Sequence, residues 1–420
     1  MTEHNNLEQK NDQKIKKSAL SIFFEEVFGG SVLIPVLAIF TGLLLGGIIV
    51  MISTEEMYIS IAEGRILQGL GQGFSAMFNS FAALFIGSIG NPAKIVSALQ
   101  SGDALAIRRA FNPILESLVQ STPYMFAGLA VALGFRTGLF NIGAEGQLFV
   151  GAIFSVWVGY TFTNLPAIIH IPFALLAGAL GGALWGYIPG LLKAKTGAHE
   201  VINTIMMNYV AFRLSEYLLR GPMMRPESFN PVSPFIQDSA KLPRFFENPI
   251  RFHLGFFVAI GIAFLVYWFM FKTKWGFDLR TVGANPDAAK YAGMNIVRST
   301  ILAMSLSGAL AGLAGANEVL GVNHNLALAF SSGYGFDAIA LALVGKSHPF
   351  GVVLASLLFG TLRNGAIKMQ VAGIPIDIIT IIQALVIVFI AAPAVLRTIY
   401  RLKEPEEGDE MISVTSWGGS

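Results

Sequence analysis

One short segment places a carboxylate and two amides between two long apolar stretches. From 140 to 147 it reads FNIGAEGQ, with almost no loop on either side. Two glycines flank the carboxylate, so the backbone is freed and the helix is expected to break there. A broken helix in a bilayer needs polar partners for its free amide and carbonyl groups. The residues predicted to face a polar solute are Phe140, Asn141, Glu145 and Gln147; the alternative is that Asn141 and Glu145 only cap the next helix.

A second segment of the same kind lies in the other half of the chain. From 333 to 337 it reads GYGFD and leads into an apolar stretch. Interrupted segments at corresponding positions of two halves are the best sequence pointer to a transport site. Phe336 and Asp337 are therefore predicted to lie on the solute path, with helix capping by Asp337 as the alternative.

A third polar motif, EVINTIMMNY, occupies residues 200–209. Glu200 and Asn203 share one helical face, and Asn208 lies beside it. Amides in a membrane helix usually bond to a neighbouring helix, and a position on the solute path is the alternative kept for Asn203 and Asn208. No second histidine lies at ligand spacing from His199, so no metal site and no catalytic residue are predicted.

The fourth motif lies in a basic segment, 272–298, predicted to be a cytoplasmic coupling loop. Asn285 is a good N-cap and Pro286 fits the first helical position. Asp287 suits the positive end of the helix dipole, and Gly293 can end the helix in a left-handed conformation. We therefore expect one helix of about two turns, capped at both ends so that it can dock on another protein. The residues assigned to this role are Gly283, Asn285, Pro286, Asp287, Ala288, Ala289, Tyr291 and Gly293.

The amino-acid composition indicates that these motifs lie in a membrane protein. Of the 420 residues, 54% are hydrophobic and only 13% are charged, whereas soluble domains carry about 25% charged residues. Gly146 to Leu192 contains no charged residue, and that run alone is long enough for two spans of about 20 residues. The partner of this surface is membrane lipid. A net charge of +2 argues against a nucleic acid polymer, and the absence of cysteine excludes disulfides and thiol sites.

The predicted fold is an all-α polytopic membrane protein with about ten transmembrane helices in two inverted-repeat-like halves. The stretch Ile66–Ala93 is uncharged but rich in Gly, Ser and Asn; it is a re-entrant or surface-lying helix pair, or an eleventh span. The expected spans are Ser31–Ile52, Pro123–Leu139, Gly146–Phe162, Ile171–Leu192, Val201–Leu219, His253–Phe271, Ser299–Ala316, Gly335–Gly345, Phe350–Leu362 and Ile378–Leu396.

Basic residues set the orientation, because cytoplasmic loops carry the excess of Lys and Arg. Residues 1–30 and 397–420 are predicted to be cytoplasmic tails on either side of a transmembrane domain, 31–396. An even number of spans then leaves both termini inside.

Two ladders of small residues recur every fourth position. One is Gly178, Gly182, Gly186 and Gly190, and the other begins at Gly308 and Gly312. Small residues on one helix face let another backbone approach closely, so both ladders predict helix packing. Their similar sequences, one in each half, indicate an internal duplication.

The chain contains no phosphate-binding loop. The segment 340–347, ALALVGKS, resembles one, but Ala340 replaces the first glycine and the stretch is apolar enough to be membrane helix. We therefore expect no ATP-hydrolysing site and no bound cofactor in this chain.

The motifs in this order resemble the permease subunits of bacterial ABC importers of the branched-chain-amino-acid and simple-sugar permease family, and most of all its nucleoside permeases. The similar strings are GLAVALGFRTG with FNIGAEGQLFVGA, EVINTIMMNY, VGANPDAAKYAGMNI and GYGFDAIALALVG. The resemblance extends from about Pro123 to Leu396.

This resemblance implies a plasma-membrane importer subunit whose ATP is used by a partner. The implied partners are a cytoplasmic ATP-binding subunit that docks at Asn285–Gly293, a second homologous permease and an extracytoplasmic solute-binding protein. The implied solute is a nucleoside. The alternatives are a simple-sugar or branched-chain-amino-acid permease, or an ion-coupled secondary transporter, to which Glu145 and Asp337 would also be suited.

Overall fold

The computed structural model describes residues 33–401, and within that range every regular element is a helix. The predicted all-α class is therefore confirmed. The tail predicted at 1–30 lies outside the described residues, and the tail predicted at 397–420 is described only at its start. The helices are α3 (Leu33–Ile52), α4 (Glu55–Ala62), α5 (Ile66–Ile89), α6 (Pro92–Ser101), α7 (Ala104–Arg136), α8 (Ala144–Thr161), α9 (Ala167–Thr196), α10 (Glu200–Arg220), η1 (Asp238–Ala240), α11 (Gly255–Lys272), α12 (Lys274–Ala284), α13 (Pro286–Tyr291), α14 (Ile296–Asn317), the π-helix η2 (Glu318–Asn323), α15 (Tyr334–Val344), α16 (Pro349–Val371), α17 (Ile376–Ala391) and α18 (Pro393–Tyr400).

The chain divides into two compact units. The smaller unit contains residues up to Ile49 together with those from Thr380 onward, and the larger one is Val50–Ile379. In the smaller unit the Thr41 hydroxyl lies 2.8 Å from the Tyr400 hydroxyl. The candidate motifs all lie in the larger unit.

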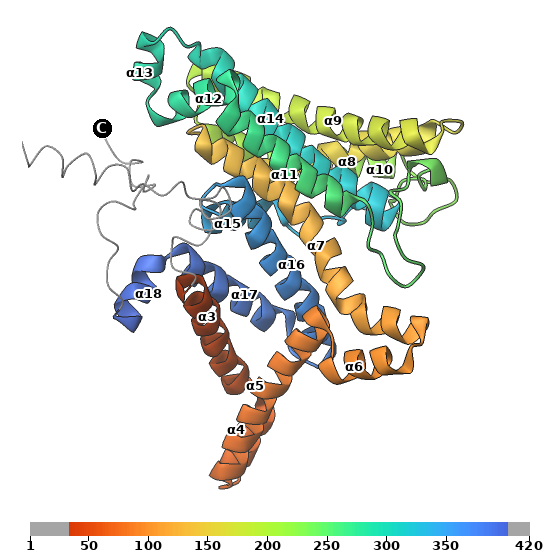
Figure 1. Cartoon of the computed structure of the whole chain (residues 1–420), viewed down its shortest axis with the longest axis vertical. Helices are drawn as coiled ribbons and strands as arrows, with labels where there is room; N and C mark the ends of the chain where they lie inside the picture. Colours follow the sequence, from red (N-terminus) through yellow and green to blue (C-terminus); the bar gives the residue numbers. More distant parts are fainter. Residues whose placement is uncertain (1–32, 402–420) are drawn as a thin grey trace, which may run out of the picture. The chain divides into compact units, whose positions relative to one another are not determined.

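Glycines bring three helices of the larger unit into backbone contact. Figure 1 shows α9 and α14 running side by side, and the two predicted glycine ladders face each other between them. A Cβ on Gly178 would lie 2.7 Å from the Ala316 Cβ and 3.2 Å from the Gly151 carbonyl oxygen of α8. The two predicted ladders therefore pack against each other.

Five described helices are long and apolar enough to cross a membrane: α7, α9, α11, α14 continued by η2, and α16. Counting each bent pair as one span (α3 with α4, α5 with α6, and α17 with α18) raises the number to eight. The ten predicted spans included α8, α10 and α15 and left out the α5–α6 pair. α15 is short, while α8 and α10 carry polar side chains along their length.

Two of the predicted boundaries need correction. The span expected at Pro123–Leu139 is the second part of the 33-residue helix α7. The ambiguous stretch Ile66–Ala93 is the pair α5 and α6, bent by 40° at Asn91, whose side chain caps α6.

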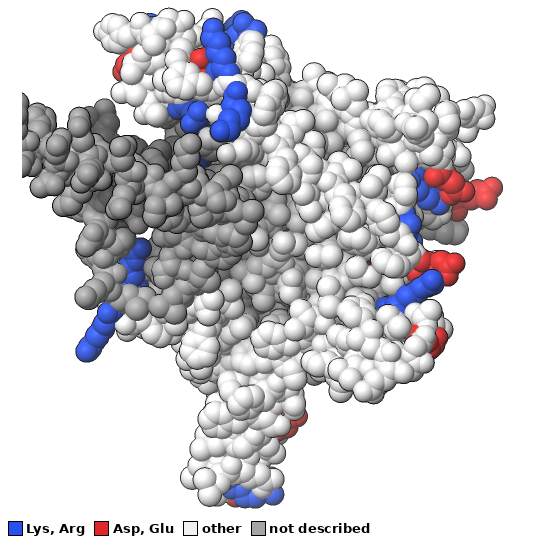
Figure 2. Space-filling view, in the orientation of Figure 1, with Lys and Arg blue, Asp and Glu red and all other residues white. Residues whose placement is uncertain are grey.

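The basic segment 272–298 contains two helices, α12 and α13, where one was predicted. Asn285 separates them, because its extended backbone ends α12 while its side chain caps α13. Figure 2 shows Lys and Arg side chains gathered where α12 and α13 lie, while the middle of α11 and α14 shows none. Figure 2 also shows Lys and Arg, mixed with Asp and Glu, at the opposite side of the larger unit, so charge lies at both ends of these helices and not along their middle.

We expect Gly312→Val to destabilise the larger unit. The new side chain would meet the backbone of Gly178 and Gly182, and overpacking of this kind costs about 1–3 kcal/mol. The measurement is the thermal unfolding midpoint of the purified chain in detergent. Gly261→Val in α11 is the matched control, because nothing lies within 4 Å of a Cβ there. Equal midpoints for the two variants would contradict this account of the packing.

Candidate functional site

The first motif forms a break between α7 and α8 deep in the larger unit. α7 ends at Arg136, Gly138 takes a left-handed conformation with φ of 69°, and α8 begins at Ala144. A Cβ on Gly138 would lie 2.8 Å from the carbonyl oxygen of Gly283, in the last turn of α12. The predicted break is confirmed, and it lies directly against the segment predicted to couple to an ATPase.

Asn141 is the centre of a buried hydrogen-bond network at this break. Its amide nitrogen donates to Gln147 Oε1 and to Ser307 Oγ, both at 2.8 Å. Its Oδ1 accepts from the Gly143 backbone N–H at 2.9 Å. Ser307 lies near the middle of α14, so the break packs against the middle of that helix. Asn141 and Gln147 are therefore bonded within the chain.

Asn208 closes the start of α8 from the side of α10. Its Oδ1 accepts from the Gly146 N–H at 2.8 Å, and its Nδ2 donates to the Ile142 carbonyl at 2.9 Å. The first turn of any helix leaves N–H groups without partners, and this side chain pairs with one of them. The interpretation of Asn208 as a bond to a neighbouring helix therefore agrees with the geometry.

Glu145 joins the two broken segments. It is 3% exposed, and its carboxylate accepts from Ser331 Oγ at 2.5 Å and from the Gly335 backbone N–H at 2.6 Å. Gly335 stands in the first turn of α15 and packs against the Glu145 backbone, leaving no room for a Cβ. The positive ends of α8 and α15 thus meet at one carboxylate, which both helix dipoles favour.

Asp337 belongs to a second polar cluster, built on α7, α15 and α16. The Tyr124 hydroxyl donates to Asp337 Oδ2 at 2.8 Å and accepts from Arg363 Nη1 at 3.0 Å. Arg363 also lies 3.8 Å from the Asp337 carboxylate and stacks over the Tyr334 ring. Tyr124, Tyr334 and Arg363 were not predicted. An arginine within an apolar stretch was the available signal for this cluster.

The two aromatic candidates have different surroundings. The Phe140 ring packs against Phe135 with ring centroids 5.1 Å apart. Phe336 is 45% exposed at the start of α15. Of the two, Phe336 is the ring with more surface available to another molecule.

α10 presents an exposed face that is polar along its outer half. Arg213 bonds Glu216 at 2.7 Å, and the side chain of Arg213 is 83% exposed. Phe212 packs on Phe149 of α8, and about 18 Å of helical rise separates Phe149 from the end of α8 at Thr161. Arg213, which follows Phe212, therefore lies beside α8 rather than beyond its end, and its partner Glu216 is half-buried.

The same helix contains Asn203, whose Nδ2 is buried without a hydrogen-bond partner in the described part of the chain. Tyr209 and Tyr217 are 65% and 70% exposed on its outward side. This helix therefore combines an unsatisfied amide, aromatic rings and charges.

The predicted capping of the coupling segment is confirmed. Asn285 Oδ1 accepts from the Ala288 N–H at 2.9 Å, Pro286 is the first helical residue, and Gly293 has φ of 80°. Asp287 lies in the first turn of α13. Ala289, however, is fully buried within the chain.

The surface of this segment is therefore made by other residues. Ala288 and Ala292 are exposed, and Tyr291 is 95% exposed. Across residues 33–401, no three His, Asp or Glu side chains converge as metal ligands would.

Comparison with known proteins gives a family and several relatives. Residues 113–391 match the family described as branched-chain amino acid transport system / permease component. The guanosine ABC transporter permease protein NupP of Bacillus subtilis is 45% identical over 289 residues, 67% of this chain and 82% of that protein. The glucose ABC transporter permease protein TsgB13 of Haloferax volcanii is 38% identical over 321 residues, 74% and 84% of the two chains. The nucleoside ABC transporter permease protein NupB of Lactococcus lactis is 32% identical over 369 residues, 86% and 90%.

Each of these three organisms has a second, more distant match, which in Haloferax volcanii is the putative glucose ABC transporter permease protein TsgC13 at 24% identity. NupQ of Bacillus subtilis is 27% identical and NupC of Lactococcus lactis is 30% identical, and their names are the same guanosine and nucleoside permease descriptions. No solved structure matches the chain.

We expect Glu145→Ala to lower the thermal unfolding midpoint of the purified chain. The substitution leaves the buried Gly335 N–H without its acceptor, which costs about 1–3 kcal/mol. Glu56→Ala removes an exposed carboxylate and should stay within about 0.5 kcal/mol. If Glu145→Ala unfolds at the same temperature as Glu56→Ala, the carboxylate does not hold α8 and α15 together.

Proposed function

The chain belongs to the family of permease components of branched-chain amino acid transport systems, and we propose that it forms half of the path by which an ATP-driven importer carries a nucleoside across the plasma membrane. The observation that carries the solute assignment is its 45% identity to a guanosine permease, supported by the nucleoside permease that matches 86% of this chain. Both broken-helix motifs fall within the matched family region.

The outward face of α10 supports a water-filled path at its surface. A charged side chain at the centre of a membrane helix costs about 2.5–3.5 kcal/mol when it faces lipid. Arg213 is 83% exposed on this helix and pairs with the half-buried Glu216, so this part of the face is better suited to water than to acyl chains. Tyr209 is 65% exposed on this face and can stack on a nucleobase.

A second permease completes the path in this proposal. Nucleoside and guanosine permeases occur as two similar proteins in Lactococcus lactis and in Bacillus subtilis. An exposed polar face on one membrane helix can be covered by the same kind of face on a related subunit. We therefore assign the surface of α10 to the side that faces a homologous permease.

The energy comes from a separate ATP-binding subunit, which we place at α12 and α13. Lys and Arg side chains gather at this end of the larger unit, which supports a cytoplasmic location. An even number of spans would leave both termini on that side as well. The exposed residues Ala288, Tyr291 and Ala292 form the docking surface. The contact between Gly283 and Gly138 offers a direct mechanical route from that surface to the broken start of α8. An extracytoplasmic solute-binding protein would deliver the nucleoside at the opposite side.

We expect the chain, reconstituted with its ATP-binding subunit, second permease and binding protein, to take up guanosine only with ATP. Ala292→Arg should reduce that uptake at least tenfold, because it places a large charge on the docking surface. Asn230→Arg, on an exposed loop away from α12 and α13, should leave uptake unchanged. Uptake of labelled guanosine into proteoliposomes is the measurement, with glucose and leucine as competing solutes. Uptake that needs no ATP, or competition by glucose rather than by nucleosides, would contradict the proposal.

For the path itself, we expect Tyr209→Cys in the assembled importer to react with a water-soluble maleimide and to be protected by guanosine. The chain has no cysteine of its own, so labelling reports this position alone. Phe264→Cys is the control, because Phe264 is similarly exposed, 57% against 65%, on the apolar helix α11. Equal labelling of the two positions would show that position 209 is no more accessible to water than position 264, and would contradict a solute path along α10.

A further inference from the structure

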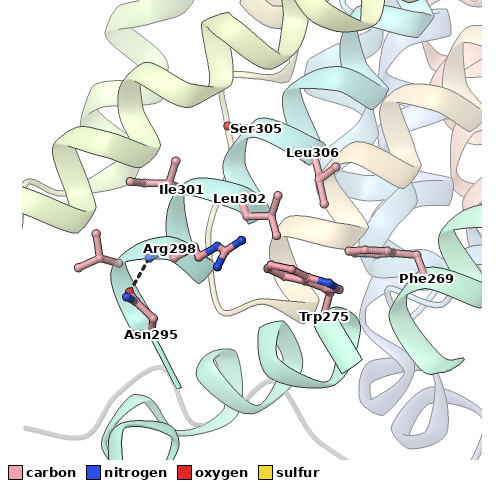
Figure 3. Close-up of a pocket in the computed structure, with 9 residues that line it drawn as sticks. Phe269, Trp275, Asn295, Arg298, Ile301, Leu302, Ser305 and Leu306 are labelled. Carbon is pink, nitrogen blue, oxygen red and sulfur yellow. Dashed lines mark hydrogen bonds between the residues drawn. The ribbon is translucent and has the colours of Figure 1, made fainter. Parts of the chain in front are cut away.

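A groove lies between the end of α11, the start of α12 and the first half of α14, outside the site described above. Its volume is about 720 Å³, within the roughly 300–1,000 Å³ typical of small-ligand sites. Figure 3 shows the aliphatic side chains of α14 and the ring of Phe269 along its length, with Arg298 at one end. Its lining residues are Phe269, Trp275, Asn295, Val297, Arg298, Ile301, Leu302, Ser305 and Leu306.

The polar end of the groove has unused hydrogen-bonding and charge capacity. The Arg298 guanidinium lies 4.4 Å from the centre of the Trp275 ring, and Asn295 Oδ1 accepts the Arg298 backbone N–H. Within residues 33–401 no carboxylate pairs with this guanidinium, and the Trp275 indole N–H has no acceptor. A cation in the first turn of α14 opposes the helix dipole, so helix stability does not explain its position.

We infer that this groove binds one anionic phospholipid, with the phosphate at Arg298 and an acyl chain along Ile301, Leu302 and Leu306. The order of groups matches a lipid at a membrane surface: cation and indole at the helix end, then aliphatic side chains toward mid-membrane. Basic pockets between membrane helices on the cytoplasmic side recognise anionic headgroups. The exposed Lys272 and Lys274 both precede Trp275 in the sequence and add to the local positive charge.

The placement suggests a structural consequence. The groove touches α11, α12 and α14, and α12 carries Gly283, which contacts the break before α8. A bound lipid would therefore hold the α11–α12 corner against α14. This inference uses only the groove and its charges, and it stands whether or not the solute is a nucleoside.

The test measures lipid binding to the purified full-length chain by native mass spectrometry and by thermal unfolding in detergent. We expect phosphatidylglycerol to bind and to raise the unfolding midpoint more than phosphatidylcholine does. Arg298→Gln should weaken phosphatidylglycerol binding about fivefold, as loss of one basic contact predicts. Lys290→Gln removes an equal charge from exposed α13, outside the groove, and should bind as the natural chain does.

Leu302→Trp distinguishes binding in the groove from attraction by positive charge alone, because the larger side chain fills the apolar part while Arg298 is kept. It should abolish the phosphatidylglycerol-dependent shift, provided its midpoint without lipid is normal; Leu302→Phe is the milder substitute if it is not. An equal shift with inorganic phosphate, equal binding by Arg298→Gln and Lys290→Gln, or crosslinking of Leu302→Cys to the second permease in membranes would each overturn the lipid assignment.

Discussion

The carboxylate of Glu145 joins α8 and α15, two helices that begin inside the larger unit. α8 and α15 each begin inside the larger unit, so their first N–H groups have no water to bond. Glu145 accepts the Gly335 N–H, and Asn208 accepts the Gly146 N–H, so two of these groups are satisfied by side chains. Without such partners neither helix could start at that depth, and the rest of the polar motif is arranged around them.

Glycine contacts connect this buried junction to the neighbouring helices. Gly335 lies on the Glu145 backbone, Gly138 lies on Gly283, and Gly151 meets Gly178 and α14. Where backbones touch directly, a shift of one helix displaces its neighbour, because no flexible side chain lies between them to absorb the motion. The coupling segment and the broken helix are therefore mechanically adjacent, although well over a hundred residues separate them in the sequence.

Breaks and caps of helices could be predicted from the sequence, because they depend on residues that are close together in the chain. The break at FNIGAEGQ and the capping of α13 by Asn285 are both present. The left-handed glycine at the break is Gly138, however, and not Gly143 or Gly146, the two glycines from which the break was predicted. The Tyr124–Asp337 bond joins residues 213 positions apart, and nothing within either segment indicates it. The inward direction of Ala289 depends on how α13 packs, which helical spacing alone does not determine. The inverted duplication of the two halves stays a prediction.

The energetics of the buried amides bear on where a solute is recognised. Asn141, Gln147 and Asn208 already have partners, and exposing each to a solute would break bonds whose loss costs about 1–3 kcal/mol when a group is left unpaired. A solute that had to compete with this network would be bound at the expense of the α8 start. Asn203, whose Nδ2 has no partner among the described residues, carries no such cost. The amides that build the broken helix therefore stay occupied, which favours the capping interpretation of the first motif. The Asn203 Nδ2 is buried as well, so it is not a surface group that a solute could reach.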